Sequence, residues 1–556
     1  MRFWTSFLFA AALAAQTQPA EVTTREETPT FQSSVSLVRV PVVVRDKQGH
    51  AVGGFHKEDF QLADRGKPAY ISQFALEGGA VPKPAAKSAQ LEMPAAVTGE
   101  APKLVAPTRF VAYVFDDLHM NPGDLMGVRA AAMKHIEHGI PPQERIALLA
   151  LSGRVAIAFT DDLWKFREAL MQVAPVPPSF QGVPPARLYM AEQFVMHNRD
   201  DILQVQTAIT ASCLELPMGS TTEQIAAATL TQVGQDGLRR ANDAFRVLNN
   251  LVGLLASMPG DRVMVLISPG MYVPDESEKR LNEVIDRATR AGVVVNALDA
   301  RGVSTVDVSG GVPGCNKVQV NVTRELAKFD REEALLQGTV LETLASSTGG
   351  TRAAQNDFQA EFDRLANPPE YIYYLGFYPK DLKPDGKFHE IKVTLAAAKG
   401  LTVTARNGYW APSHEENAAA TATREISEAV FSRDEMQDLH LDIRTEFYKT
   451  TEEDAKLTVA SHLDLGQLRL RKQDDRNLDD VTVVCALFDR NGNFVKGTQT
   501  VTEIRLKDVN VARQRASGVG VTSEFDVKSG AYLIRVVARD AEGRQMAAVN
   551  GEVEIP

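Results

Sequence analysis

The sequence has few cysteines and none of the short motifs on which several common enzyme classes depend. Only three cysteines occur among 556 residues, and their spacing fits no zinc-binding pattern. The chain contains no Gly-x-Ser-x-Gly elbow, no Walker phosphate-binding loop and no His-Glu-x-x-His pair. Because these signatures are absent, we expect that the protein is not an enzyme.

Long hydrophobic runs and an excess of positive charge are lacking too. Beyond the N-terminus no apolar stretch reaches the length of about 20 residues that a membrane-spanning helix needs. The formal net charge is −11, and no basic stripe is interleaved with aromatic residues, so nucleic acid is not an expected partner. The hydrophobic fraction of 44% and the charged fraction of 24% are those of globular proteins, and the length predicts about three or four domains.

Residues 1–15 have the pattern of a cleavable secretion signal. Arg2 precedes the apolar core FWTSFLFAAALAA, in which Ala12, Ala14 and Ala15 supply the small residues of a cleavage site. The core is too short to span a bilayer comfortably, and no cysteine follows it as a lipid attachment site. We therefore expect a secreted or periplasmic protein with no transmembrane segment after cleavage; a retained anchor is the alternative.

The chain is organised around an apolar run that ends in two carboxylates. Phe110–Phe115 is β-branched and aromatic without clean alternation, which predicts a strand buried on both faces of a parallel sheet. Further strands are expected at 145–152, 155–160, 262–268, 293–299 and 371–378, with helices at 123–139, 239–257 and 276–291. This alternation predicts an α/β fold with a doubly wound, mostly parallel sheet. Ligands bind at the carboxyl ends of strands in such sheets, where Asp116, Asp117 and His119 fall.

Several stretches of the sequence resemble the von Willebrand factor type A (VWFA) domain. They are the strand ending in VFDDLHM, the segment LETLASSTGGTRAAQNDFQAEFDRLANPPEYIYYLGFYP, the leading VRVPVVVRDKQGHAVGGFHKEDFQLADRGK and the trailing RNGYWAP. Together they cover residues 35–412 and are similar to the VWFA-related proteins of Acidobacteria. The resemblance implies a Rossmann-like type A domain at 108–380 that binds other macromolecules through loops at the carboxyl edge of its sheet.

Type A domains that bind ligands through magnesium use an Asp-x-Ser-x-Ser loop, with a Thr and an Asp from later loops. Carried over to this chain, Asp116 matches the first Asp, but Leu118 and Met120 stand in place of the two serines. The strand that ends at Ser268 continues into Pro-Gly and lacks the later Asp. The resemblance therefore implies a degenerate metal site.

Two neighbours of Asp116 can substitute as ligands. Asp116, Asp117 and His119 form a candidate site for a divalent cation such as Mg or Mn, although two acids after a strand are also common turn formers. Successive residues point apart, so we expect Asp116 and His119 to converge, and magnesium to bind weakly or not at all. His135 and His138, one turn apart on the following helix, are expected on an exposed face.

The segments on either side of the α/β region are expected to be β-rich. Turn sequences at 46–49 and 64–66 predict short antiparallel strands in residues 34–76, and residues 385–412 have the pattern of a further hairpin. Each is too small to bury a core alone, so we predict that they pair into one β-sandwich domain, with the α/β domain inserted between them. The remaining segments are a linker at 78–107, a helical linker at 413–435 and an immunoglobulin-like or fibronectin-like β-sandwich at 436–556.

The α/β region also contains an insertion at residues 175–235 that a minimal type A domain does not need. Its helical spacing predicts a cap beside the carboxyl edge of the sheet.

Cys213 in the insertion and Cys315 in a later irregular segment are both expected at that edge, which in an oxidising compartment predicts a disulfide between them. Cys485 lies within a predicted strand and is expected to be buried and reduced.

The combined expectation is an exported, non-catalytic protein in which the type A domain mediates adhesion or protein binding at the cell envelope, with no certain cofactor. Two alternatives stay open. A metal-assisted hydrolase would use Asp116, Asp117 and His119. A purely structural envelope component would use the fold without any binding site.

Overall fold

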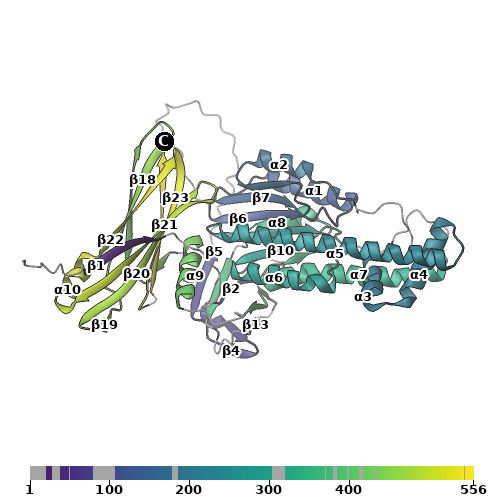
Figure 1. Ribbon diagram of the computed structural model, residues 1–556, viewed down its shortest axis with the longest axis horizontal. Helices are drawn as coiled ribbons and strands as arrows, with labels where there is room; N and C mark the ends of the chain where they lie inside the picture. Colours follow the sequence, from purple (N-terminus) through teal and green to yellow (C-terminus); the bar gives the residue numbers. More distant parts are fainter. Residues whose placement is uncertain are drawn as a thin grey trace, which may run out of the picture.

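A computed structural model of the protein describes residues 21–27, 38–48, 50–78, 107–177, 186–303, 320–367, 369, 371–377, 379, 385–396, 400–411, 418–432, 435–543 and 545–556. The expected signal at 1–15 and most of the expected linker at 78–107 lie outside these residues. The described chain forms an α/β part with long helices, a small β part beside it and a large β part that contains the C-terminus (Figure 1). No helix among the described residues combines the length and the apolar character needed to cross a membrane.

A six-stranded sheet is the centre of the α/β part. Its strands lie in the order β11-β10-β9-β6-β7-β8, and all neighbours are parallel except β7 and β8. The strands are β6 (Arg109–Phe115), β7 (Glu144–Ala150), β8 (Ala156–Thr160), β9 (Asp261–Ser268), β10 (Val293–Asp299) and β11 (Arg352–Ala353). The carboxyl ends of β6, β9 and β10 therefore meet at one edge of the sheet.

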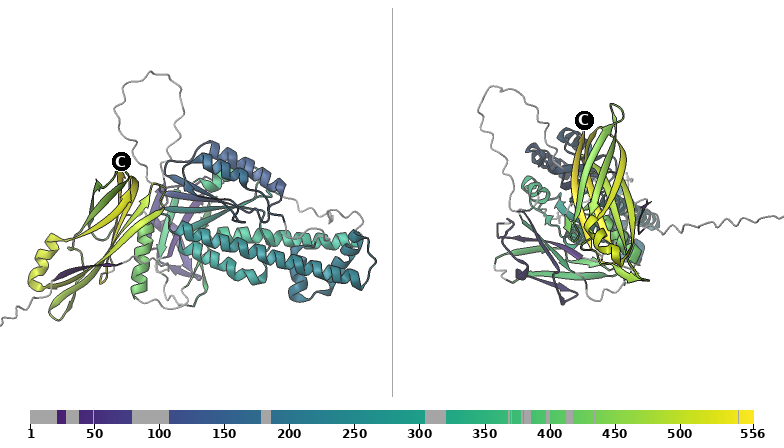
Figure 2. Two further views of the ribbon diagram at one scale, coloured as in Figure 1. Left: turned by 45° about the horizontal axis from the view of Figure 1, so that its top comes forward. Right: turned by 90° about the vertical axis from the view of Figure 1, so that its left-hand side faces the viewer.

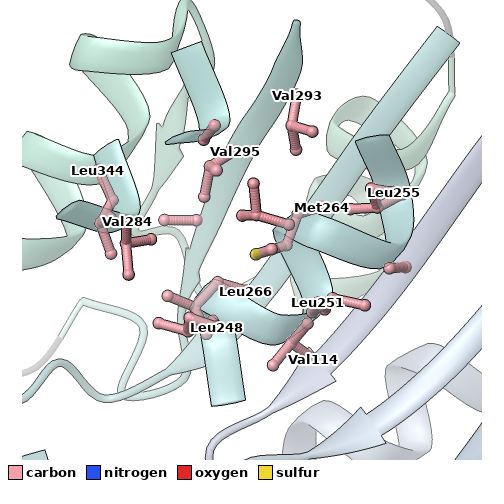
Figure 3. Close-up of a cluster of buried hydrophobic side chains, with 14 of the residues drawn as sticks. Val114, Leu248, Leu251, Leu255, Met264, Leu266, Val284, Val293, Val295 and Leu344 are labelled. Carbon is pink, nitrogen blue, oxygen red and sulfur yellow. The ribbon is translucent and has the colours of Figure 1, made fainter. Parts of the chain in front are cut away.

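The residues of β6 alternate between two hydrophobic cores. Phe110 and Val114 pack on one face of the sheet, and Val111 and Phe115 pack on the other. Helices α1 (Pro122–Glu137), α2 (Leu163–Gln172) and α8 (Phe358–Ala366) cover the second face, and α5 (Ser220–Ala256), α6 (Glu278–Arg290) and α7 (Val320–Thr348) cover the first. Figure 3 shows side chains of β9 and β10 meeting those of α5, α6 and α7. Burial on both faces explains why β6 has no polar alternation.

The insertion belongs to a helical extension that projects away from the C-terminal part (Figure 2). Helices α3 (Leu188–His197) and α4 (Asp200–Leu214) pack there against α5 and α7 around a small apolar cluster. The sequence predicts a helix at 239–257, but α5 begins at Ser220, within the insertion, and is one continuous helix of 37 residues. Gly237 lies within this helix, where a Cβ would clash with the side chain of Leu188. The absence of a side chain at this position allows α3 to pack close to α5.

The small β part joins strands from both sides of the α/β part. One four-stranded sheet has the order β14-β2-β12-β5, and the other has the order β15-β13-β3-β4. The strands are β2 (Val38–Arg45), β3 (Phe60–Asp64), β4 (Lys67–Ala69), β5 (Gln73–Gly78), β12 (Tyr371–Phe377), β13 (Phe388–Leu395), β14 (Thr402–Ala405) and β15 (Gly408–Trp410). Residues 34–76 and 385–412 thus meet through β2 with β14 and through β3 with β13.

Strand β12 is not where the sequence predicts it. The run at 371–378 is expected to close the α/β sheet, but β12 pairs with β2 and β5. Its inward side chains Tyr373, Leu375 and Phe377 are fully buried in the core of the small β part. The Tyr373 hydroxyl also donates to the carbonyl of Val52 at 3.0 Å. The α/β sheet ends at β11, so the α/β part ends near residue 367 and not at 380.

The C-terminal part consists of two antiparallel sheets around one core. One sheet contains β17 (Leu441–Lys449), β18 (Asp454–Leu463) and β22 (Val519–Lys528). The other contains β1 (Val22–Glu27), β16 (Met436–Gln437), β19 (Arg471–Gln473), β20 (Arg476–Asp489), β21 (Phe494–Lys507), β23 (Gly530–Asp540) and β24 (Met546–Ile555). A helix, α10 (Asp508–Ser517), follows β21.

Two segments outside 436–556 belong to this part. Strand β1 pairs with β21, which the sequence does not predict. Helix α9 (Ala418–Phe431), expected as a linker, packs Ala429 and Val430 against the outer face of the seven-stranded sheet. The segment therefore covers a sheet face as well as connecting two parts.

The turn between β20 and β21 touches the amino-terminal edge of the α/β sheet. Arg145 Nε donates to Asn491 Oδ1 at 3.2 Å, and Arg490 pairs with Asp161 at 3.0 Å. A Cβ at Gly492 would lie 2.3 Å from Phe110 Cζ, so only glycine allows this close contact. The backbone at Gly492 has a φ of +82°, which also favours glycine.

A buried polar network lies beneath β6 on the face covered by α1 and α8. Tyr113 Oη lies 2.9 Å from His135 Nε2, and His135 Nδ1 lies 2.5 Å from Asp363 Oδ1. His135 is only 8% exposed, so its expected position on an exposed face is wrong. The ring fills the space between α1 and α8, where its two nitrogens find partners on both sides. Nearby, Glu144 lies 3.6 Å from Arg109 and is also buried.

Glu144→Gln is expected to remove a pH-dependent loss of stability. Burial raises the pKa of Glu144 from 4.5 to about 7, and the nearby Arg109 only partly opposes this shift. The folded chain therefore keeps a proton that the unfolded chain releases between these two pKa values, so stability falls as the pH rises through that window. The total loss is about 3 kcal/mol.

Chemical denaturation near pH 5 and near pH 8 measures this effect. The wild type should lose about 2.5 kcal/mol more than Glu144→Gln between the two conditions, because part of the loss has already occurred at pH 5. The exposed variant Glu137→Gln is the matched control and should behave like the wild type. Equal pH dependence in the wild type and Glu144→Gln would contradict the expectation.

Candidate functional site

The carboxyl ends of three strands bring acidic and hydroxyl side chains to one edge of the six-stranded sheet. Asp116 and Asp117 follow β6 directly, and Ser268 and Asp299 are the last residues of β9 and β10. All four side chains are buried. A buried carboxylate is costly unless it is hydrogen-bonded, so the partners of each acid decide what this edge can do.

Asp116 is bonded on both oxygens by groups of the same chain. The backbone N–H of His119 donates to Oδ1 at 3.1 Å, and His119 Nδ1 lies 2.8 Å from the same oxygen. Ser268 Oγ donates to Oδ2 at 2.6 Å, and the backbone N–H of Gly270 donates to Ser268 Oγ at 3.0 Å. The carboxylate therefore joins the loop after β6 to the loop after β9.

Asp117 faces a different loop. Its Oδ1 accepts the backbone N–H of Ser152 at 2.8 Å, and its Oδ2 accepts the Ser152 hydroxyl at 2.5 Å, in the turn between β7 and β8. Burial raises the pKa of Asp117, and the two bonds from Ser152 oppose that shift. The backbone N–H of Val176 donates to the Asp117 carbonyl at 2.7 Å, which ties the start of the insertion to this loop.

Arg240 of α5 holds the loop after β6 from the side of the helical extension. Its Nη1 donates to the Leu118 carbonyl at 2.5 Å, and its Nη2 donates to the Pro177 carbonyl at 2.8 Å. Its Nε donates to Asp236 Oδ2 at 2.9 Å, which orients the guanidinium on the helix. The long helix therefore positions the loop that carries the candidate site.

These bonds do not suit the divalent metal that the resemblance implies. A hard cation needs several oxygen ligands that converge, but both oxygens of Asp116 already accept bonds and Asp117 points elsewhere. Leu118 and Met120 supply no side-chain oxygen. Within the described ranges no three or more His, Cys, Asp or Glu side chains are grouped so that they could hold a metal ion. Asp116 and His119 meet as expected, but Asp117 does not join them.

A second cluster lies at the end of the neighbouring strand β10. Asp299 Oδ1 accepts Arg301 Nε at 3.0 Å, and Asp299 Oδ2 accepts Arg301 Nη2 at 2.9 Å and Arg352 Nη2 at 2.8 Å. The Asp299 side chain is 3% exposed, compared with 19% for Arg301 and 28% for Arg352. Arg352 Nε is buried and has no hydrogen-bond partner among the described residues. Two guanidinium groups face the Asp299 carboxylate, and the carboxylate of Asp124 is close enough to interact electrostatically with Arg301 and Asp299.

Sequence reasoning did not identify several of these contact residues. Ser268 and Asp299 each end a predicted buried strand, and a polar residue in that position is a signal for the ligand-binding edge of a parallel sheet. Arg240, Arg301 and Arg352 gave no comparable signal. Each reaches the edge from an element whose position depends on tertiary packing.

The cysteines are only partly described. Cys213, in α4, is disulfide-bonded. Cys315 lies outside the described residues, so the pairing of these two cysteines stays a prediction. Cys485 is a buried free thiol, as expected. Burial raises its pKa to about 12, which keeps the sulfur protonated and unreactive.

Ser268→Ala is expected to destabilise the protein by about 1–3 kcal/mol. The substitution removes the shorter of the two contacts to Asp116 Oδ2, a buried carboxylate oxygen, and leaves only His119 Nδ1 at 3.0 Å. Chemical denaturation of the full chain measures the loss. Ser257→Ala is the control, because the Ser257 hydroxyl makes an exposed bond to the Leu254 carbonyl and should matter little. Equal stability of the two variants would refute the role of Ser268.

Magnesium is expected not to bind at Asp116. Isothermal titration calorimetry of the full chain should show no heat that depends on this carboxylate, because its oxygens are already bonded. The wild type and Asp116→Asn should therefore give the same magnesium titration. Micromolar magnesium binding that disappears in Asp116→Asn would mean that the loop rearranges to form a metal site.

No family model and no curated protein matches this chain. Two solved structures of a β-glucosidase from Kluyveromyces marxianus, one in complex with glucose and one selenomethionine-labelled, are similar over 56% of this chain, with 10% and 9% identity. The chain covers 33% of each of those proteins. The TM-scores of 0.11 and 0.10 are too low for this likeness to carry an argument about fold or function.

Proposed function

We propose that the protein is an exported, non-catalytic binding protein whose α/β part is a von Willebrand factor type A domain with a degenerate metal site. The strand order supports the type A assignment, because parallel strands flank a central β6 and the edge strand β8 is antiparallel. Helices on both faces and an acid directly after β6 support it further. The proposed domain covers residues 108–367, with β-sandwich domains on either side.

The observation that carries the proposed binding function is the arginine pair on Asp299. Arg301 and Arg352 lie at the carboxyl edge, are partly exposed and share a single buried carboxylate. A carboxylate of a partner can bond to a guanidinium in a paired geometry, and the guanidinium-bearing side chains of Arg301 and Arg352 are 19% and 28% exposed. We therefore propose that this edge binds an acidic group of an envelope protein or another macromolecule, without a bridging metal ion.

The helical extension adds surface suited to a protein partner. It exposes large apolar side chains, which are Val195, Met196, Leu214, Met218, Leu335 and Leu336. Exposed apolar side chains near a charged edge are typical of surfaces that bind other proteins. This composition favours a protein over a small ligand as the partner.

Hydrolysis is the second candidate function, and the contact that favours it is the one between Asp116 and His119. A carboxylate that orients an imidazole is half of a general-base arrangement. Ser268 bonds to Asp116 and not to His119, however, so these residues do not form a nucleophile and base pair. A panel of esters and phosphates would support hydrolysis if turnover appeared and was lost in Asp116→Ala.

The double variant Arg301→Gln, Arg352→Gln is expected to lose its partner. The full chain, immobilised and incubated with the envelope fraction of its own source, should retain specific proteins that the variant does not retain, because both partly exposed guanidinium groups are gone. Removal of magnesium, with calcium kept in the buffer, should not change the recovery.

Arg290→Gln is the matched control for this experiment. Arg290 pairs with Asp286 on α6, away from the carboxyl edge, so the control should bind like the wild type. Recovery of the same proteins by the double variant would contradict the assignment of the edge. Recovery of no specific protein by the wild type would favour the structural alternative.

A further inference from the structure

The C-terminal part contains two buried carboxylates at the end of its core. Asp479 of β20 is 2% exposed and Asp540 of β23 is 0% exposed. Both lie on the inner face of their sheet, because Val481 and Ala538, two residues away on the same strands, belong to the core between the sheets. Asp540 is opposite Val481 in the pairing of β20 with β23. Asp479 is therefore the diagonal neighbour of Asp540 on the same face.

Each of the two carboxylates has one bonded and one unbonded oxygen. Asp479 Oδ1 accepts the backbone N–H groups of Asp480 at 2.8 Å and Glu542 at 3.3 Å. Asp540 Oδ1 accepts the backbone N–H of Gly543 at 2.7 Å. The Oδ2 atoms of both are buried with no hydrogen-bond partner among the described residues. When both acids are ionised, neither Oδ2 has a donor, which is a costly arrangement for buried charge.

A third acceptor lies beside Asp540 on the opposite strand. The backbone N–H of Asp540 donates to the Gln545 carbonyl at 3.0 Å, which continues the pairing of β23 with β24. Gln545 shares the inner face with Ala547, a core residue. Its Oε1 is also buried and has no partner in the described part of the chain. Asp540 therefore has Asp479 on one neighbouring strand and Gln545 on the other, and all three side chains have an oxygen without a hydrogen-bond partner among the described residues.

The turn between β23 and β24 closes tightly over these oxygens. A Cβ at Gly543 would lie 2.4 Å from Asp540 Oδ2, so the backbone approaches the carboxylate where no side chain fits. Glu542 does not add a free charge there, because it pairs with Arg471 at 2.8 Å. The pair needs a counter-ion or a proton.

We propose that Asp479, Asp540 and Gln545 form a calcium-binding site. Carboxylate and amide oxygens without a competing donor are the ligands that calcium prefers, at about 2.3–2.6 Å and with flexible geometry. Magnesium is less suitable because it demands a near-ideal octahedron. A proton shared by Asp479 and Asp540 is the competing arrangement, and the absence of calcium binding would favour it. The site lies in a different part from the proposed binding edge and does not depend on that proposal.

Calcium titration of the full chain, freed of metal with a chelator, tests the site. Calorimetry should show one saturable site with a dissociation constant on the order of 10⁻⁴ M, as in extracellular calcium modules. Asp479→Asn and Asp540→Asn should each weaken binding at least about tenfold, since each removes a charged ligand. Asp480→Asn is the matched control, because this neighbouring acid points to the other face of β20. No calcium binding by the wild type, or binding retained in both variants, would overturn the proposal.

Hydrogen exchange on the wild type gives a second measurement that needs no variant. Calcium should slow amide exchange in β20, in β23 and in the turn at 541–545, because the ion would join these elements. Little change is expected in β17 and β18. Slowed exchange confined to elements other than β20, β23 and this turn would place the ion elsewhere and refute the site.

Discussion

The antiparallel pair of β5 and β12 is the constraint on which the arrangement of the whole chain depends. Tyr371 lies opposite Gly78 in this pair, so two residues that are adjacent in the sheet are separated in sequence by the entire α/β part. Residues 79–370 are therefore one long connection between neighbouring strands. The α/β part can fold within that connection because the two points where its chain leaves and returns lie close together.

Strand β2 completes this arrangement. It lies between β12 and β14, and Val38, Val40, Val42 and Val44 are all fully buried. Each of its two partners follows the α/β part in sequence, whereas β2 precedes it. Neither of the two segments of the small β part, one before and one after the α/β part, is therefore stable alone, since neither can bury its valine and aromatic side chains without the other.

The buried acids in or directly after the strands differ in the number of donors that surround them. Asp116 and Asp299 accept bonds on both oxygens, so they fix loops and arginine side chains in place. Asp479 and Asp540 each have an oxygen without a donor. An acid after a buried strand is thus a weak signal by itself. The count of donors around it separates a structural role from a ligand role.

Local structure could be predicted from the sequence, whereas contacts between residues far apart in the chain could not. The buried run at β6 and the turn glycines of the small β part follow from residue type and spacing alone. The run YIYYLGFY at β12 is equally compatible with a parallel sheet and with a sandwich, because its partners are chosen by contacts far away in sequence. His135 was misplaced for a related reason, since the helix α8 that covers it comes much later in the chain. At the site, Asp116 and His119 were within reach of sequence reasoning, whereas Arg240 and Arg352 were not.

Strand β1 places the first described residues of the chain in the sheet formed by its last segment. Val22–Glu27 pairs with β21, and Asn510 Nδ2 donates to Glu21 Oε2 at 2.8 Å. During synthesis β1 is made long before β21, so β1 has no pairing partner until the C-terminal segment has been synthesised. A processing cut after residue 15 leaves the strand whole. Without β1, the stretch of β21 from Gln499 to Ile504 would become the edge of the sheet in its place, with backbone N–H and C=O groups that have lost their partners. The two ends of the described chain are therefore joined in one sheet by backbone hydrogen bonds.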